Sequence, residues 1–314
     1  MRCPPSRSRS TLVAAFVVLV TACGSSDDEP QSRSVAPVDG VPLVVVTYSV
    51  LGDVVRQLVG DAATVEVVIP NGQDPHDYAA SAHDVERMSD AAMIVANGLD
   101  LEEGLIEPIE QLEADGVPVV RASDYILVRQ IGPDEPADHD EEDEHEGGDP
   151  HLWTDPLTMA ELAPSMGDEL GRALGVDLTV HVTAFEHEMA ELDAQVRDIL
   201  SVVPAGRCIL VTGHDSLGYF AARYHCQVIG AVVPSLSSTA EASAKDLAEL
   251  LDVAESSGVG AIFTEAGTPA QVAEQIADEL GVPSIELPSH KLPETGGYRA
   301  YITDLATRIA DGLT

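Results

Sequence analysis

The chain has 314 residues, of which 45% are hydrophobic, so it is long enough to form two globular domains of ordinary size. Its formal net charge of −38 argues against binding to nucleic acid or to anionic lipid by charge. The same charge attracts cations weakly over the whole surface, which does not by itself make a site.

The N-terminus has the pattern of a bacterial export signal, which we place at residues 1–22. Three arginines precede an apolar run over residues 12–20, which is too short to span a bilayer as a stable helix. Residues 20–23 resemble a lipobox, so we expect a lipid anchor on Cys23 and a flexible polar tether over residues 23–40. The alternative is an ordinary signal cleaved near that cysteine, which would leave a free secreted protein.

Short β-rich runs then alternate with amphipathic segments, which predicts βα units and an α/β fold with mostly parallel sheets. We place a first (β/α) domain at residues 41–176. The strands predicted in it are 43–47, 65–69, 92–96 and 117–120, and the helices are 50–59, 82–88, 101–112 and 156–174.

One long helix is predicted to join this domain to a second one. Residues 178–202 contain neither Gly nor Pro, their apolar residues follow helical spacing, and Asp177 can cap the start. We therefore expect a rigid linking helix within residues 177–203 and a second (β/α) domain at 204–314. The strands predicted there are 208–212, 227–233, 261–264 and 284–287, and the helices are 216–224, 240–256, 269–280 and 299–311.

An acidic segment with interspersed histidines occupies residues 134–148 of the first domain. It is too charged to be buried, so we expect a solvated loop. One interpretation is a surface loop that contains histidines by chance. The other is that His139 and His145 are low-affinity helpers in metal capture, since such tracts are a compositional hint of metal binding.

The sequence Asp-Pro-His occurs twice, at residues 74–76 and 149–151, each time with an aromatic residue two positions later. Proline stiffens the approach and the aromatic ring packs beside the histidine, so that the imidazole is presented in one orientation. We expect both motifs to lie just past strands. His76 and His151 are therefore candidate metal ligands.

Two further histidines, His214 and His290, follow predicted strands of the second domain, where ligands usually bind. Any one such histidine is more often an ordinary surface or core residue. Four imidazoles converging from both domains would form a zinc-like set, whereas manganese would recruit more carboxylate oxygen. We expect His290 and the acidic segment to loosen on metal release, because their neighbours constrain them least.

Two cysteines, Cys208 and Cys226, remain outside the N-terminal signal and anchor. We expect a disulfide between them, because export permits one and the segment between them could be a helix that links two neighbouring strands. The alternative is two buried free thiols.

Together these motifs resemble the zinc-binding lipoproteins of ABC importers, the ZnuA/TroA-like family. The resemblance covers essentially all of the chain after the signal. It implies two (β/α) domains joined by a rigid backbone helix, a metal site between them, and delivery of the metal to a membrane permease. The segments that carry it, besides the lipobox, are residues 72–78, the acidic segment before 149–153, 213–220 and 238–243.

Position by position, the resemblance implies that His76, His151 and His214 are the three histidine ligands of the family. The family's fourth ligand is usually Asp, and its position aligns with His290, which leaves Glu294 or water as alternatives. Glu265 is expected to accept an imidazole N–H rather than to bind the metal.

We therefore expect an exported, lipid-anchored, monomeric Zn²⁺-binding protein on the outer face of the cytoplasmic membrane, which serves an ABC permease and its cytoplasmic ATPase. The alternatives are a Mn²⁺ or Fe²⁺ receptor, or a surface adhesin on the same scaffold. An exported zinc hydrolase is disfavoured because the sequence contains neither His-Glu-x-x-His nor Gly-x-Ser-x-Gly.

Overall fold

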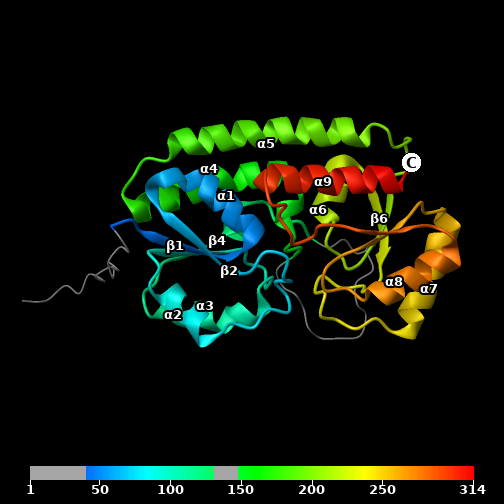
Figure 1. Cartoon of the computed structure of the whole chain (residues 1–314), viewed down its shortest axis with the longest axis horizontal. Coiled ribbons are helices and arrows are strands. Elements are labelled where there is room, and N and C mark those ends of the chain that lie inside the picture. Colours follow the sequence, from blue (N-terminus) through cyan, green and yellow to red (C-terminus); the bar gives the residue numbers. More distant parts are fainter. Residues whose placement is uncertain (1–39, 131–147) are drawn as a thin grey trace, which may run out of the picture. The chain divides into compact units, whose positions relative to one another are not determined.

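The structure of the chain is a computed structural model that describes residues 40–130 and 148–314 (Figure 1). The described residues belong to one compact unit. The predictions for Cys23, His139 and His145 fall outside the described residues. Within the two described ranges, no helix combines the length and the apolar character needed to cross a membrane.

The first half of the chain builds a four-stranded parallel sheet in the order β2-β1-β3-β4. The strand β1, with the sequence Leu-Val-Val-Val-Thr-Tyr, is mostly apolar and is buried along its whole length, as expected of a strand inside a parallel sheet. The elements of this first half are β1 (Leu43–Tyr48), α1 (Ser49–Val59), β2 (Thr64–Ile69), α2 (Ala82–Ser89), β3 (Met93–Ala96), α3 (Ile106–Ala114) and β4 (Val119–Arg121).

The second half contains two short parallel pairs, β5 with β6 and β7 with β8, and β5 also contacts β7. All strand pairs in the described residues are parallel, which confirms the predicted α/β class. The elements are β5 (Ile209–Thr212), α6 (Gly218–Tyr224), β6 (Gln227–Ala231), α7 (Ala244–Ser257), β7 (Ile262–Thr264), α8 (Ala270–Leu280), β8 (Ser284–Glu286) and α9 (Gly297–Gly312).

Two long helices, α4 (Pro156–Leu174) and α5 (Thr179–Leu200), lie between these halves in the sequence. α4 has the predicted bounds because Asp155 caps its first turn, and Gly175 ends it with a φ of 69° that favours glycine. α5 buries one face against α4 and α9, which lie alongside it (Figure 1). The division into domains at 41–176 and 204–314 stays a prediction.

The predicted helix over 101–112 is wrong in its first turn. α3 begins only at Ile106, after a short 3₁₀ helix over Glu103–Leu105. Shortly before the 3₁₀ helix, Leu99 and Asp100 both have left-handed backbone angles, with φ of 57° and 56°. This conformation is unfavourable for residues with a side chain, so it breaks the helical pattern and turns the chain sharply.

The structure joins Cys208 and Cys226 by a disulfide, with their Cα atoms 4.6 Å apart. Each cysteine stands one residue before its strand, β5 or β6, and α6 lies between the two strands in the sequence. The bond therefore ties together the starts of two paired strands.

Candidate metal centre

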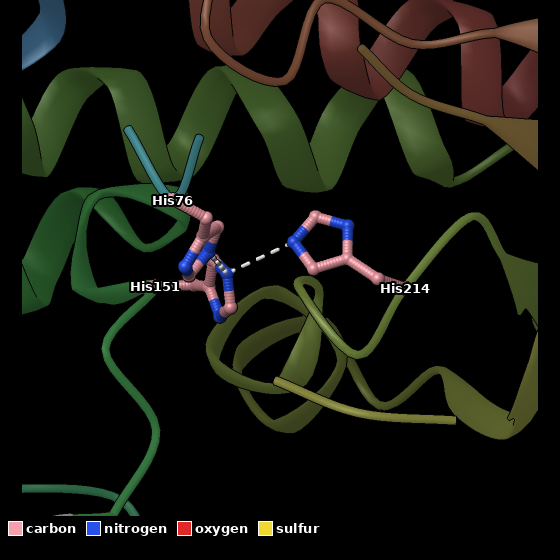
Figure 2. Close-up of side chains that lie close together, drawn as sticks. All are labelled: His76, His151 and His214. Atoms are coloured by element: carbon pink, nitrogen blue, oxygen red, sulfur yellow. Dashed lines mark hydrogen bonds between the residues drawn. The ribbon is translucent and has the colours of Figure 1, made fainter. Parts of the chain in front are cut away.

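Three buried histidines from distant parts of the chain meet at one point (Figure 2). His76 lies in the loop after β2, His151 stands before a 3₁₀ turn that leads into α4, and His214 follows β5 by two residues. One ring nitrogen from each lies within 4.8 Å of the others, and the residues are only 5%, 0% and 0% exposed. The structure thus brings together three of the four predicted ligands.

The spacing of the ring nitrogens suits a small tetrahedral ion. Nε2 of His151 lies 3.4 Å from Nε2 of His76 and 3.1 Å from Nε2 of His214. Zinc–nitrogen bonds of about 2.0–2.1 Å at tetrahedral angles separate two ligand nitrogens by roughly 3.3–3.4 Å. A zinc-sized ion therefore fits among these three atoms with little rearrangement.

A carboxylate stands behind each imidazole. Nδ1 of His151 is 2.9 Å from Asp149 Oδ1, Nδ1 of His214 is 3.3 Å from Glu265 Oε2, and Nδ1 of His76 is 3.5 Å from Glu103 Oε1. A carboxylate acceptor places the proton of a neutral imidazole on Nδ1 and leaves a lone pair on Nε2. In the tautomers with the proton on Nδ1, the Nε2 lone pairs face one another, an arrangement that a cation between them would stabilise.

The two Asp-Pro-His motifs fold in the same way. The backbone N–H of His76 donates to Asp74 Oδ1 at 3.1 Å, and the backbone N–H of His151 donates to Asp149 Oδ1 at 2.9 Å. The prediction that both motifs follow strands is wrong for His151, because the last described strand before it is β4. Its orientation is fixed instead by the 3₁₀ turn and α4 that come after it.

The aromatic residue of the second motif packs where predicted. The ring of Trp153 is 1% exposed and lies 5.4 Å from that of His151 and 5.6 Å from that of His290. Its Nε1–H donates to Ser289 O and Tyr301 Oη, so the ring cannot rotate freely. The aromatic wall of the site is thereby anchored to α9.

Two of the imidazoles have pKa values shifted in opposite directions. Burial, reinforced by the neighbouring histidines, holds the pKa of His151 well below its usual value. Burial also acts to lower the pKa of His214, but the carboxylate of Glu265, together with those of Asp74 and Asp215, outweighs it, so that the pKa of His214 is raised. Burial raises the pKa of Asp149 to about 6, although His151 and Arg129 oppose this shift. At neutral pH the site therefore combines neutral His151 with carboxylates that support it.

His290 lies beside this group and not in it. It is 2% exposed, its ring centre is 6.4 Å from that of His214, and its Nε2 is 3.7 Å from Asp74 Oδ1. Neither ring nitrogen has a hydrogen-bond partner of standard geometry. Burial lowers the pKa of His290 to about 4, so it is neutral and able to bind a metal. The expectation that its neighbours constrain it little is wrong, because Trp153 packs against it.

The other two acidic candidates differ in position. Glu265 is 5% exposed and lies behind His214, where the resemblance implied that it would accept an N–H. Glu294 is exposed to solvent and is not part of the histidine group. Glu103 was missed by sequence reasoning, because it lies 27 residues after His76 and belongs to no local motif.

Comparison with known proteins identifies the family. A family model described as "ZnuA: Zinc-uptake complex component A periplasmic" matches residues 44–312. The zinc-binding protein TroA of Treponema pallidum is 32% identical over 248 residues, which cover 78% of this chain and 77% of TroA. The manganese-binding lipoprotein MntA of Halalkalibacterium halodurans is 24% identical over 277 residues, which cover 87% of this chain and 85% of MntA.

Comparison with solved structures agrees with the family found by sequence comparison. The structure of the periplasmic zinc-binding protein TroA from Treponema pallidum matches with a TM-score of 0.75 and 30% sequence identity, over 87% of this chain and 99% of that one. This chain therefore shares the fold of TroA over nearly the full length of the TroA chain. The chain belongs to the ZnuA/TroA family of periplasmic metal-binding proteins, the non-enzymatic solute-binding components of ABC importers.

Proposed function

We propose that this protein captures Zn²⁺ with Nε2 of His76, His151 and His214 and delivers it to the permease of an ABC importer. The observation that carries the proposal is the convergence of these three imidazoles: Nε2 of His151 lies 3.4 Å from that of His76 and 3.1 Å from that of His214, and a carboxylate stands behind each ring. His290 is the proposed fourth ligand, with water as the alternative. We also keep the lipid anchor on Cys23 as a proposal.

The chemistry of the site favours zinc over manganese. The convergent atoms are imidazole nitrogens, which suit zinc, whereas manganese prefers carboxylate oxygen. The carboxylates of Glu103, Asp149 and Glu265 lie nearest to the Nδ1 side of the rings, away from the point where the Nε2 atoms meet. Manganese remains the second candidate, because the relative MntA is named a manganese-binding lipoprotein.

Competitive titration of purified residues 24–314 tests the choice of metal. We expect about one equivalent of zinc to bind tightly, and manganese to bind more weakly because the site offers it few oxygen ligands. Deletion of residues 134–147 is expected to remove only weaker additional zinc binding. Tighter binding of manganese than of zinc would contradict the proposal.

A further inference from the structure

The carboxylate that lies behind His76 is hydrogen-bonded to a residue that follows a strand of a different sheet. The carboxylate behind His76 belongs to Glu103, and both residues lie in connections between strands of the four-stranded sheet. Oε1 of Glu103, the oxygen that faces His76, accepts a hydrogen bond of 2.6 Å from Ser237 Oγ. Ser237 follows β6, a strand of another sheet. A hydroxyl from the second half of the chain thus orients a carboxylate in the first half.

The other two carboxylates are held differently. Ser216 Oγ donates to Glu265 at 2.6 Å, and both residues lie in the second half with His214. Arg129 donates to Asp149 at 3.2 Å, and both lie in the first half with His151. Among the donors described here for the three carboxylates, Ser237 is the one that lies on the opposite half of the chain from its histidine.

The segment of residues 235–239, which we name the serine segment, is built to present its hydroxyls. The backbone N–H of Thr239 donates to Ser237 Oγ at 3.3 Å, and the Thr239 hydroxyl lies 2.7 Å from the same oxygen. Because Ser237 Oγ accepts from Thr239, its own proton is available for Glu103. The next residue, Ser238, donates to Asp74 Oδ2 at 2.5 Å, so the segment also holds the turn that precedes His76.

The connection that carries Glu103 also has unusual backbone geometry. The left-handed residues Leu99 and Asp100 turn the chain into it, and such strain persists only where the surroundings enforce it. A Cβ on Gly104 would lie 2.1 Å from Tyr78 O, so only glycine lets Glu103 come this close to the loop of His76. Even so, the side chain of Glu103 is 41% exposed, and the hydrogen bond from Ser237 is one of the contacts that orient it.

We infer that Ser237 is a positioning residue that acts through Glu103 on His76, and that His76 is the ligand released first when the serine segment separates from Glu103. This rests on the proposed zinc function. Contact between the two sheets orients the carboxylate, which lies 3.5 Å from Nδ1 of His76 and favours the tautomer whose Nε2 lone pair faces the ion. Loss of that contact loosens the carboxylate behind His76, while the carboxylates behind His151 and His214 keep donors from their own halves of the chain.

The test measures the dissociation rate of zinc in excess chelator. Ser237→Ala is expected to raise this rate about 10-fold, the lower end of the effects seen when an outer partner of a ligand is removed. Ser237→Thr is expected to restore the wild-type rate, since it keeps the hydroxyl. The matched control is Ser243→Ala, which removes an exposed hydroxyl that only caps α7, and its rate is expected to stay within about two-fold of wild type.

A double-mutant cycle identifies the route. Glu103→Ala is expected to raise the rate at least as much as Ser237→Ala, and combining the two should add nothing further. The partly exposed Glu103 also supplies a variant, Glu103→Gln, should Ser237→Ala fail to fold. An unchanged rate in Ser237→Ala or Glu103→Gln, additive effects in the cycle, or an equal effect of Ser243→Ala would overturn the inference. Failure of the wild-type protein to bind zinc would instead defeat the proposed function.

Discussion

Replacing His214 with alanine is expected to weaken zinc binding by about 100- to 1000-fold. Apparent zinc-binding energies of about 10–16 kcal/mol, shared among four ligands, give about 2.5–4 kcal/mol for each ligand. That range corresponds to about two to three powers of ten in the dissociation constant. His214 is fully buried and its Nε2 faces that of His151, so no other described side chain is placed to substitute for it without rearrangement.

Competitive titration of His214→Ala beside the wild type measures this loss. The matched control is His187→Ala, because the His187 side chain is 77% exposed on α5 and does not belong to the group of three converging histidines. Thermal unfolding gives an independent readout, since zinc that binds only the folded state stabilises it by mass action. We expect zinc to raise the melting temperature of the wild type and of His187→Ala, and to leave that of His214→Ala nearly unchanged. Full zinc affinity in His214→Ala would exclude this residue as a ligand.

Acidification is expected to release zinc, with His214 protonating before His151. The pKa of His214 is raised because the carboxylate of Glu265, together with those of Asp74 and Asp215, outweighs the effect of burial, whereas burial keeps the pKa of His151 low. A metal ligand must be deprotonated, so zinc affinity is constant above the raised pKa of His214. Below it, affinity falls by about 10-fold for each pH unit and each proton displaced.

Glu265→Gln separates this mechanism from a general effect of acid. Without the carboxylate the largest contribution that raises the pKa of His214 is lost, so this pKa falls and the loss of zinc begins at a lower pH. At neutral pH the same variant is expected to bind zinc about 10- to 100-fold more weakly, because the outer partner of a ligand is altered. Glu294→Gln, which alters an exposed carboxylate, is the control and should follow the wild-type curve. Coincident pH curves for Glu265→Gln and the wild type would refute the assignment.

The sequence singles out the three histidines that converge in the structure, and two of them belong to motifs that are local. Asp-Pro-His at 74–76 and 149–151 folds into the same turn twice, since the aspartate reaches the histidine N–H only two residues on. α4 was predicted at its true bounds for a similar reason, as Asp155, Pro156 and Gly175 are start and stop signals that act within one turn.

The carboxylates behind the histidines were harder to predict because tertiary contacts choose them. Glu103 and Ser237 are 134 residues apart, and neither belongs to a pattern that requires the other. The helix expected at 101–112 shows the same limit, because the left-handed residues Leu99 and Asp100 override the apolar spacing there. The helix expected from Ala240 starts only at Ala244, where a capping box at Ser243 competes successfully with helix propensity.

The coordination shell of bound zinc tests the central claim most directly, and X-ray absorption of the protein loaded with one equivalent of zinc measures it. We predict three or four nitrogen neighbours at about 2.0–2.1 Å with the scattering pattern of imidazole rings. This would correspond to His76, His151 and His214, with His290 or water completing the shell. A shell made mostly of oxygen, with fewer than three imidazoles, would contradict the account.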